Sequence, residues 1–96
     1  MGKKNNRYSI NLKELALKDE SLAEKSVEFE FENHDNIFNI IDILKSKELF
    51  DKDSESVEFA VGLKLFSEVM LKNRKHELFE DFFPHFGEFM KKLKAM

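Results

Sequence analysis

The stretch V-E-F-A-V-G-L-K-L-F-S-E-V-M-L, residues 57–71, carries apolar side chains at ten of its fifteen positions. Two lines of apolar residues recur at helical spacing, namely Phe59, Leu63, Phe66 and Met70, and beside them Val57, Val61 and Leu65. A surface helix normally has one apolar face, so a helix that is apolar around most of its circumference is covered on several sides. We therefore expect this helix to be the element against which the others pack. Glu58, Lys64 and Glu68 interrupt it too often for a membrane span.

Length and composition predict one globular domain over residues 1–96, with residues 1–6 as a loose N-terminus. Apolar residues make up 42% of the chain and charged residues 36%, which is not the composition of a disordered chain. The chain has eleven Phe, one Tyr and no Trp, which predicts a Phe-rich core with some rings left for a partner surface. There is no cysteine, so disulfides and thiol chemistry are excluded. No apolar run follows the polar start, so we expect no signal peptide and a cytoplasmic location.

Two segments alternate between apolar and polar residues in the manner of half-buried strands, residues 7–13 and residues 26–32. Antiparallel pairing sets Tyr8 opposite Phe31, Ile10 opposite Phe29, Leu12 opposite Val27 and Arg7 opposite Glu32. A shift of one residue would place the Phe side chains in water, so burial fixes this register. Residues 14–25 are predicted to be a long hairpin connection. Leu15 and Leu22 are apolar enough that we expect part of it to lie back on the core.

The second half of the chain has the periodicity of helices. Ile37, Ile40, Ile41 and Leu44 mark one face of a helix that ends near Lys47. A polar turn over residues 51–56 precedes the helix that contains residues 57–71. The last segment starts near His76 and is interrupted by Pro84, which predicts a short helix, a kink and a second helix with Pro84 near its first position. The predicted fold class is α+β, a two-stranded antiparallel hairpin followed by three helices, the last kinked at a proline, with the helices on one face of the sheet.

The histidines do not form a recognisable site. His34, His76 and His85 have no partners at the spacing of metal ligands. A zinc site would require them to converge in space, and the simpler interpretation is that they cap helices or face solvent. We therefore predict no metal, no cofactor and no catalytic residue.

Other polar groups also have structural explanations. Glu28, Glu30 and Glu32 form a row on one strand face, which is typical of a solvated surface that discourages aggregation. No serine lies in a nucleophile motif and no glycine-rich phosphate loop occurs, so we expect no enzyme. The lysines at positions 91, 92 and 94 could touch phosphates, but the dipole at a helix C-terminus explains them without a ligand. Gly62 inside a helix predicts that another element, such as the last helix, approaches closely there.

Three segments resemble a small family of uncharacterised bacterial proteins, a domain of unknown function of about this length. They are F-E-F-E-N-H-D-N-I-F (29–38), F-A-V-G-L-K-L-F-S-E-V-M-L-K-N-R-K (59–75) and F-G-E-F-M-K-K-L-K (86–94). The opening R-Y-S-I (7–10) is similar too. The resemblance implies a small bacterial domain, and it carries over no activity, ligand or catalytic residue.

The leading functional hypothesis is a non-enzymatic protein-interaction module, either a homodimer or a binder of another protein. The unpaired strand edges and the abundance of Phe favour a symmetric contact through an edge or a helix face. The glutamate row argues against face-to-face stacking of two hairpins, because like charges would meet. The alternative is a binder of a small or lipid-like molecule, with a Phe-lined pocket between the sheet and the last helix. The net charge of −3 disfavours nucleic acid, and no membrane association is predicted.

Overall fold

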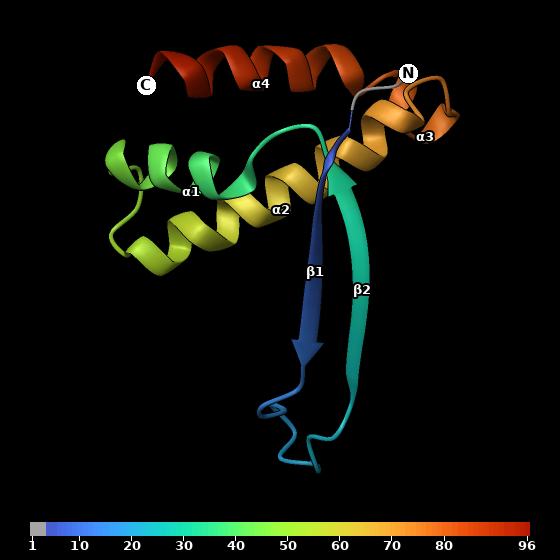
Figure 1. The fold of residues 1–96 in the computed structure, drawn as a ribbon, viewed down its shortest axis with the longest axis vertical. Helices are drawn as coiled ribbons and strands as arrows, with labels where there is room; N and C mark the ends of the chain where they lie inside the picture. Colours follow the sequence, from blue (N-terminus) through green and yellow to red (C-terminus); the bar gives the residue numbers. More distant parts are fainter. Residues whose placement is uncertain (1–3) are drawn as a thin grey trace. The chain divides into compact units, whose positions relative to one another are not determined.

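The computed structural model describes residues 4–96 and divides into two compact units, of which the first ends at Asn36 and the second is Ile37–Met96. We call them the hairpin unit and the helical unit. The hairpin unit holds two antiparallel strands, and the helical unit holds four helices (Figure 1). The predicted α+β class is therefore confirmed. The last two helices, over residues 77–80 and 83–95, correspond to the two parts of the predicted last helix on either side of its kink.

The hairpin unit pairs β1 (Asn6–Lys13) with β2 (Ser26–Asn33) in the predicted register. Tyr8 lies opposite Phe31 and their rings stack with centroids 5.4 Å apart. Arg7 lies opposite Glu32 as predicted, but its guanidinium pairs with Glu30, the diagonal neighbour, at 2.5 Å. Diagonal neighbours are within reach of a long side chain. β1 begins at Asn6, inside the segment predicted to be loose, and residues 1–3 of that segment lie outside the described residues.

The 14–25 connection is held by its own polar groups. The Glu14 N–H donates to the Lys25 carbonyl at 2.9 Å, and the Lys25 N–H donates to Glu14 Oε1 at 2.8 Å. Leu15 and Leu22 are 86% and 76% exposed. Within residues 4–36, no part of the hairpin unit therefore covers these two leucines.

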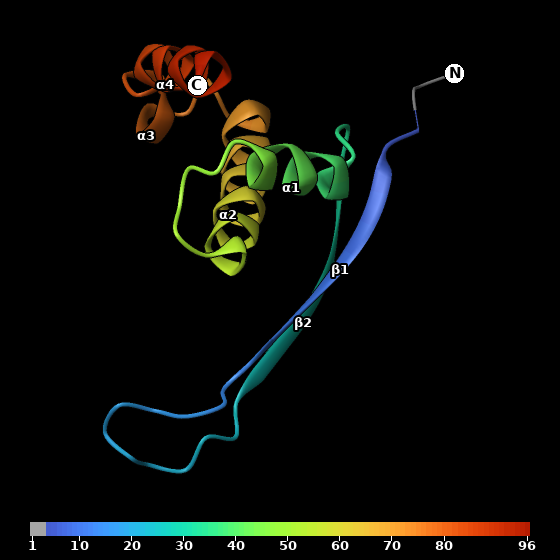
Figure 2. The same ribbon diagram turned by 90° about the vertical axis from the view of Figure 1, so that its left-hand side faces the viewer.

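In the helical unit, α1 (Ile37–Ser46) packs closely against α2 (Asp53–Lys72), and Figure 2 shows the two helices crossing. α1 buries the predicted face through Ile37, Ile41 and Leu44. The buried stripe of α2 consists of Ser56, Ala60, Leu63, Ser67 and Met70. Three of these side chains are small, which lets a neighbouring backbone approach. The predicted stripe is therefore half correct, since Leu63 and Met70 are buried whereas Phe66 is 44% exposed.

The short α3 (Glu77–Glu80) and α4 (Phe83–Ala95) meet α2 through aromatic rings. Seven Phe form a continuous series of ring contacts, with centroids 5.4–6.4 Å apart, that we call the aromatic ladder: Phe50, Phe59, Phe66, Phe79, Phe82, Phe86 and Phe89. Within residues 4–96, a Cβ added at Gly62 would meet no side chain or other element within 4 Å beyond its chain neighbours and the adjoining backbone of α2. The predicted close approach at Gly62 is therefore wrong, because rings and not backbones make this contact.

Pro84 lies in the first turn of α4, as predicted. Proline is favoured there because the N–H it lacks would have no partner within the helix. Among the helices of residues 4–96, none is both long enough and apolar enough to cross a membrane.

Candidate functional site: an aromatic pocket beside the last helix

The helical unit contains a pocket of about 410 Å³. Its lining residues come from the connection between α1 and α2, from α2 and from the last turns of α4: Leu49, Phe50, Phe59, Phe89, Lys92, Leu93 and Met96. We call it the aromatic pocket. A Phe-lined pocket was predicted between the sheet and the last helix, whereas this one is lined by residues 49–96 alone.

Phe59 of α2 is the central ring of the aromatic pocket. It stands edge-on to Phe50, with centroids 5.4 Å apart at 72°, and edge-on to Phe89, with centroids 6.4 Å apart at 72°. Edge-to-face pairs at these separations are attractive because the positive ring edge meets the negative ring face. The three rings therefore form one wall of the aromatic pocket, with Phe59 in contact with both of the others.

A hydrogen bond links the segment after α1 to the residue that follows α4. Lys47, just after α1, donates from Nζ to the backbone oxygen of Met96 at 2.6 Å. The Met96 N–H donates to the Leu93 carbonyl at 3.3 Å, so the chain keeps a helical turn up to Met96. Leu93 is only 8% exposed and lies at the base, whereas Met96 is 63% exposed.

Among the residues of 4–96 that line the aromatic pocket, Lys92 is the one with a charged side chain. Within residues 4–96, no ion pair of Lys92 occurs. The other lysine nearby, Lys47, is already engaged with Met96. Within residues 4–96, the aromatic pocket therefore combines six apolar side chains with one cationic side chain that makes no ion pair.

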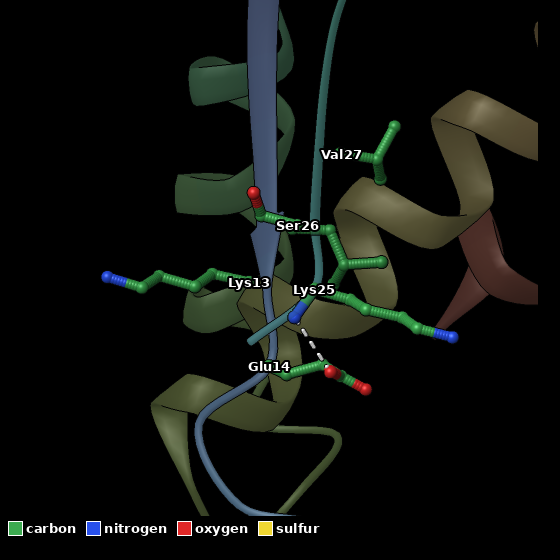
Figure 3. Close-up of a pocket in the computed structure, with 6 residues that line it drawn as sticks. Lys13, Glu14, Lys25, Ser26 and Val27 are labelled. Atoms are coloured by element: carbon green, nitrogen blue, oxygen red, sulfur yellow. Dashed lines mark hydrogen bonds between the residues drawn. The ribbon is translucent and has the colours of Figure 1, made fainter. Parts of the chain in front are cut away.

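A second hollow lies at the end of the hairpin and is lined by Leu12, Lys13, Glu14, Lys25, Ser26 and Val27. Figure 3 shows the side chains of Lys13 and Lys25 pointing to opposite sides. Glu14 accepts the Lys25 N–H, drawn there as a dashed line. Because the side chains of Lys13 and Lys25 point apart, they would not contact the same anionic group in this hollow.

The structure places the three predicted histidines in separate settings. His34 Nε2 lies 3.6 Å from Asp35 Oδ1 with its side chain 59% exposed. His76 caps α3, where its Nδ1 accepts the Leu78 N–H at 3.1 Å. His85 is exposed on α4. No group of three or more His, Asp or Glu that could hold a metal ion is found within residues 4–96.

Lys92 lines the aromatic pocket, whereas the sequence indicated it only as one of three lysines that could touch phosphates and that the helix dipole explains without a ligand. The signal was present in the spacing, because Phe89, Lys92, Leu93 and Met96 recur at the helical positions i, i+3, i+4 and i+7. These positions share one helix face, so the lysine lies on the same side as three apolar side chains.

The chain belongs to the family described as a domain of unknown function with a solved structure (DUF3861), which matches residues 6–95. It is also similar to a protein of unknown function from Pectobacterium atrosepticum, whose crystal structure was determined at 2.20 Å resolution. The two sequences are 35% identical, the structures superpose with a TM-score of 0.85, and the match covers 97% of this chain and 100% of the other. No curated protein matches this chain. The predicted resemblance to a bacterial family of unknown function is therefore confirmed.

Proposed function

We propose that this protein is a small non-enzymatic interaction module that forms a homodimer through its hairpin unit. The observation that carries the proposal is a group of exposed apolar side chains in the 14–25 connection and in the strand halves next to it. We call it the hairpin patch: Leu12 (66% exposed), Leu15 (86%), Leu22 (76%), Val27 (51%) and Phe29 (42%).

The hairpin patch is the kind of surface that a partner covers. Leu12 lies directly opposite Val27, and Phe29 lies two residues further along the same face of β2. A two-stranded sheet is marginally stable in water unless its apolar face is covered. Contiguous exposed apolar surface marks interaction sites in soluble proteins. Covering this patch would therefore stabilise the hairpin as well as join two molecules.

A second copy of the chain suits the charges of the hairpin. Glu28 and Glu30 lie on the opposite face from Val27 and Phe29, so two hairpins that stack through their apolar faces keep their glutamates in water. The repulsion expected from the glutamate row thus applies to the polar faces alone. By contrast, pairing two β2 edges around Phe29 would set Glu28 of each copy opposite Glu30 of the other, which is unfavourable. We therefore propose that two copies meet through the apolar faces of their hairpins, related by a two-fold axis.

Light scattering coupled to size exclusion, run at about 50 µM, tests the proposal. The parent should elute with twice the 11.4 kDa mass of one chain. Val27→Glu should be monomeric, because a carboxylate would be buried in the contact. Ser26→Glu is the matched control and should remain dimeric, since it adds the same charge on the opposite face. A parent mass of one chain, or equal behaviour of the two variants, would contradict the proposal.

A further inference from the structure

We propose that the aromatic pocket binds a small amphiphilic carboxylate, whose apolar chain lies against Phe50, Phe59 and Phe89 and whose anionic end meets Lys92. This site lies wholly within the helical unit and does not depend on the dimer proposed above. The ligand class follows from the size, the lining and the charge of the aromatic pocket.

The volume of the aromatic pocket, about 410 Å³, falls in the range of about 300–1,000 Å³ that is usual for small-molecule sites. Six of the seven lining residues are apolar. Phe50 and Phe89 remain 37% and 45% exposed. A hydrocarbon chain placed between them would remove that ring surface from water, which is the main favourable term for such a ligand.

The ring contacts indicate that the pocket is open before a ligand arrives. Phe59 is held between Phe50 and Phe89, and the end of α4 is tied to Lys47 through Met96. Collapse of the pocket would require breaking these contacts. A preformed site avoids part of the ordering cost that otherwise weakens binding.

The single cation selects the head group. Lys92 has no protein partner among residues 4–96, whereas Lys47 is engaged with Met96. One ammonium matches the single charge of a carboxylate. A phosphate monoester carries about −1.5 to −2 charges at neutral pH, and a lone lysine would leave much of that charge unpaired. The geometry thus favours a carboxylate over a phosphate.

Isothermal titration calorimetry with octanoate and 1-octanol on the full chain tests this assignment. Octanoate should bind saturably, and lengthening the chain to decanoate should tighten binding by about three- to fourfold for each buried methylene. Lys92→Gln should weaken octanoate binding about two- to fivefold, as expected for an exposed ion pair. The same substitution should leave 1-octanol unchanged. Lys91→Gln is the matched control, because Lys91 precedes Lys92 on the same helix and does not line the pocket.

Amide chemical-shift mapping with octanoate locates the site. The shifts should centre on Leu49, Phe89 and Leu93, and they should persist in Val27→Glu, which separates this result from the fate of the dimer. The proposal is overturned if octanoate shows no saturable binding, if the shifts centre on the hairpin patch, or if Lys92→Gln and Lys91→Gln bind octanoate equally. Circular dichroism of both variants verifies that they fold like the parent.

Discussion

Phe66 of α2 stands edge-on to Phe86 of α4, with ring centroids 6.2 Å apart at 69°. The same ring also meets Phe79 and Phe82, each at 6.1 Å. One side chain thus connects the long helix to both helices that follow it. Because each aromatic pair contributes about 0.5–1.5 kcal/mol beyond the area it buries, Phe66 should matter to stability even though it is 44% exposed.

Shortening the side chain of Leu63 or of Phe66, which lie on different faces of α2, should therefore lower the stability of the protein. Leu63→Ala leaves a cavity at a buried position and should lower the free energy of unfolding by about 2–5 kcal/mol. Phe66→Ala should lower it by about 2–3 kcal/mol, less than a fully buried ring would, because part of the ring is already in water. Urea denaturation followed by circular dichroism measures both. Val69→Ala, at a position 53% exposed, should change it by under about 1 kcal/mol. If all three curves overlay the parent, α2 is not the central element.

The strands and helices could be predicted because apolar residues recur about every two residues in a half-buried strand and about every 3.6 residues in a helix. The alternation of residues 26–32 allowed one register only, and that register is the one observed. The interior of the helical unit was harder to predict. When a helix is apolar on nearly all sides, its pattern does not say which side receives the neighbouring helix. Here small residues such as Ser56 and Ala60 occupy the buried stripe of α2. The large rings of α2, Phe59 and Phe66, belong to the aromatic ladder.

A Phe-lined pocket was predicted as an alternative, but the residues that line the aromatic pocket could not be predicted, for a different reason. Leu49 and Leu93 are far apart in sequence and become neighbours only through the tertiary fold. The role proposed for Lys92 was not evident from the sequence, because a lysine in the last turn of a helix already has a sufficient explanation in the helix dipole. Helical spacing alone shows that Lys92 shares a face with apolar residues, but not that this face lines a hollow.

Pro84 offers a test of the break between α3 and α4. Proline at the start of a helix reduces the freedom of the unfolded chain, so Pro84→Ala should lower the free energy of unfolding by about 0.4–1 kcal/mol. Helix content measured by circular dichroism should hold or rise, since alanine permits the two helices to join. A higher melting temperature in the variant would show that the break has no role in packing.

The hairpin connection contains a carboxylate with a shifted titration. Asp19 Oδ1 accepts hydrogen bonds from the Ser21 hydroxyl at 2.6 Å and from the Ser21 N–H at 3.0 Å. These bonds favour the charged form and lower the pKa of Asp19 from its ordinary value of 3.8. Because the folded pKa is the lower one, this contribution to stability is present above the unfolded value and is lost as pH falls through the folded value.

Ser21→Ala removes the largest cause, the hydroxyl bond, and should move the pKa of Asp19 back toward 3.8. An NMR titration of the Asp19 carboxyl carbon in parent and variant measures the difference. Ser26→Ala, in β2, is the control and should leave the Asp19 titration unchanged. An identical titration in the parent and in Ser21→Ala would show that the hydroxyl does not hold the carboxylate.

Gly62 lies in the middle of α2, and within residues 4–96 a Cβ there would meet nothing within 4 Å beyond its chain neighbours and the adjoining backbone of α2. Glycine in a helix interior costs about 0.8–1.0 kcal/mol relative to alanine because it loses more backbone entropy on folding. Gly62→Ala should therefore raise the free energy of unfolding by about that amount, measured by urea denaturation. Gly87→Ala in α4, where the space is equally open, should give a similar gain. A loss of stability at position 62 alone would mean that another surface occupies the space beside Gly62.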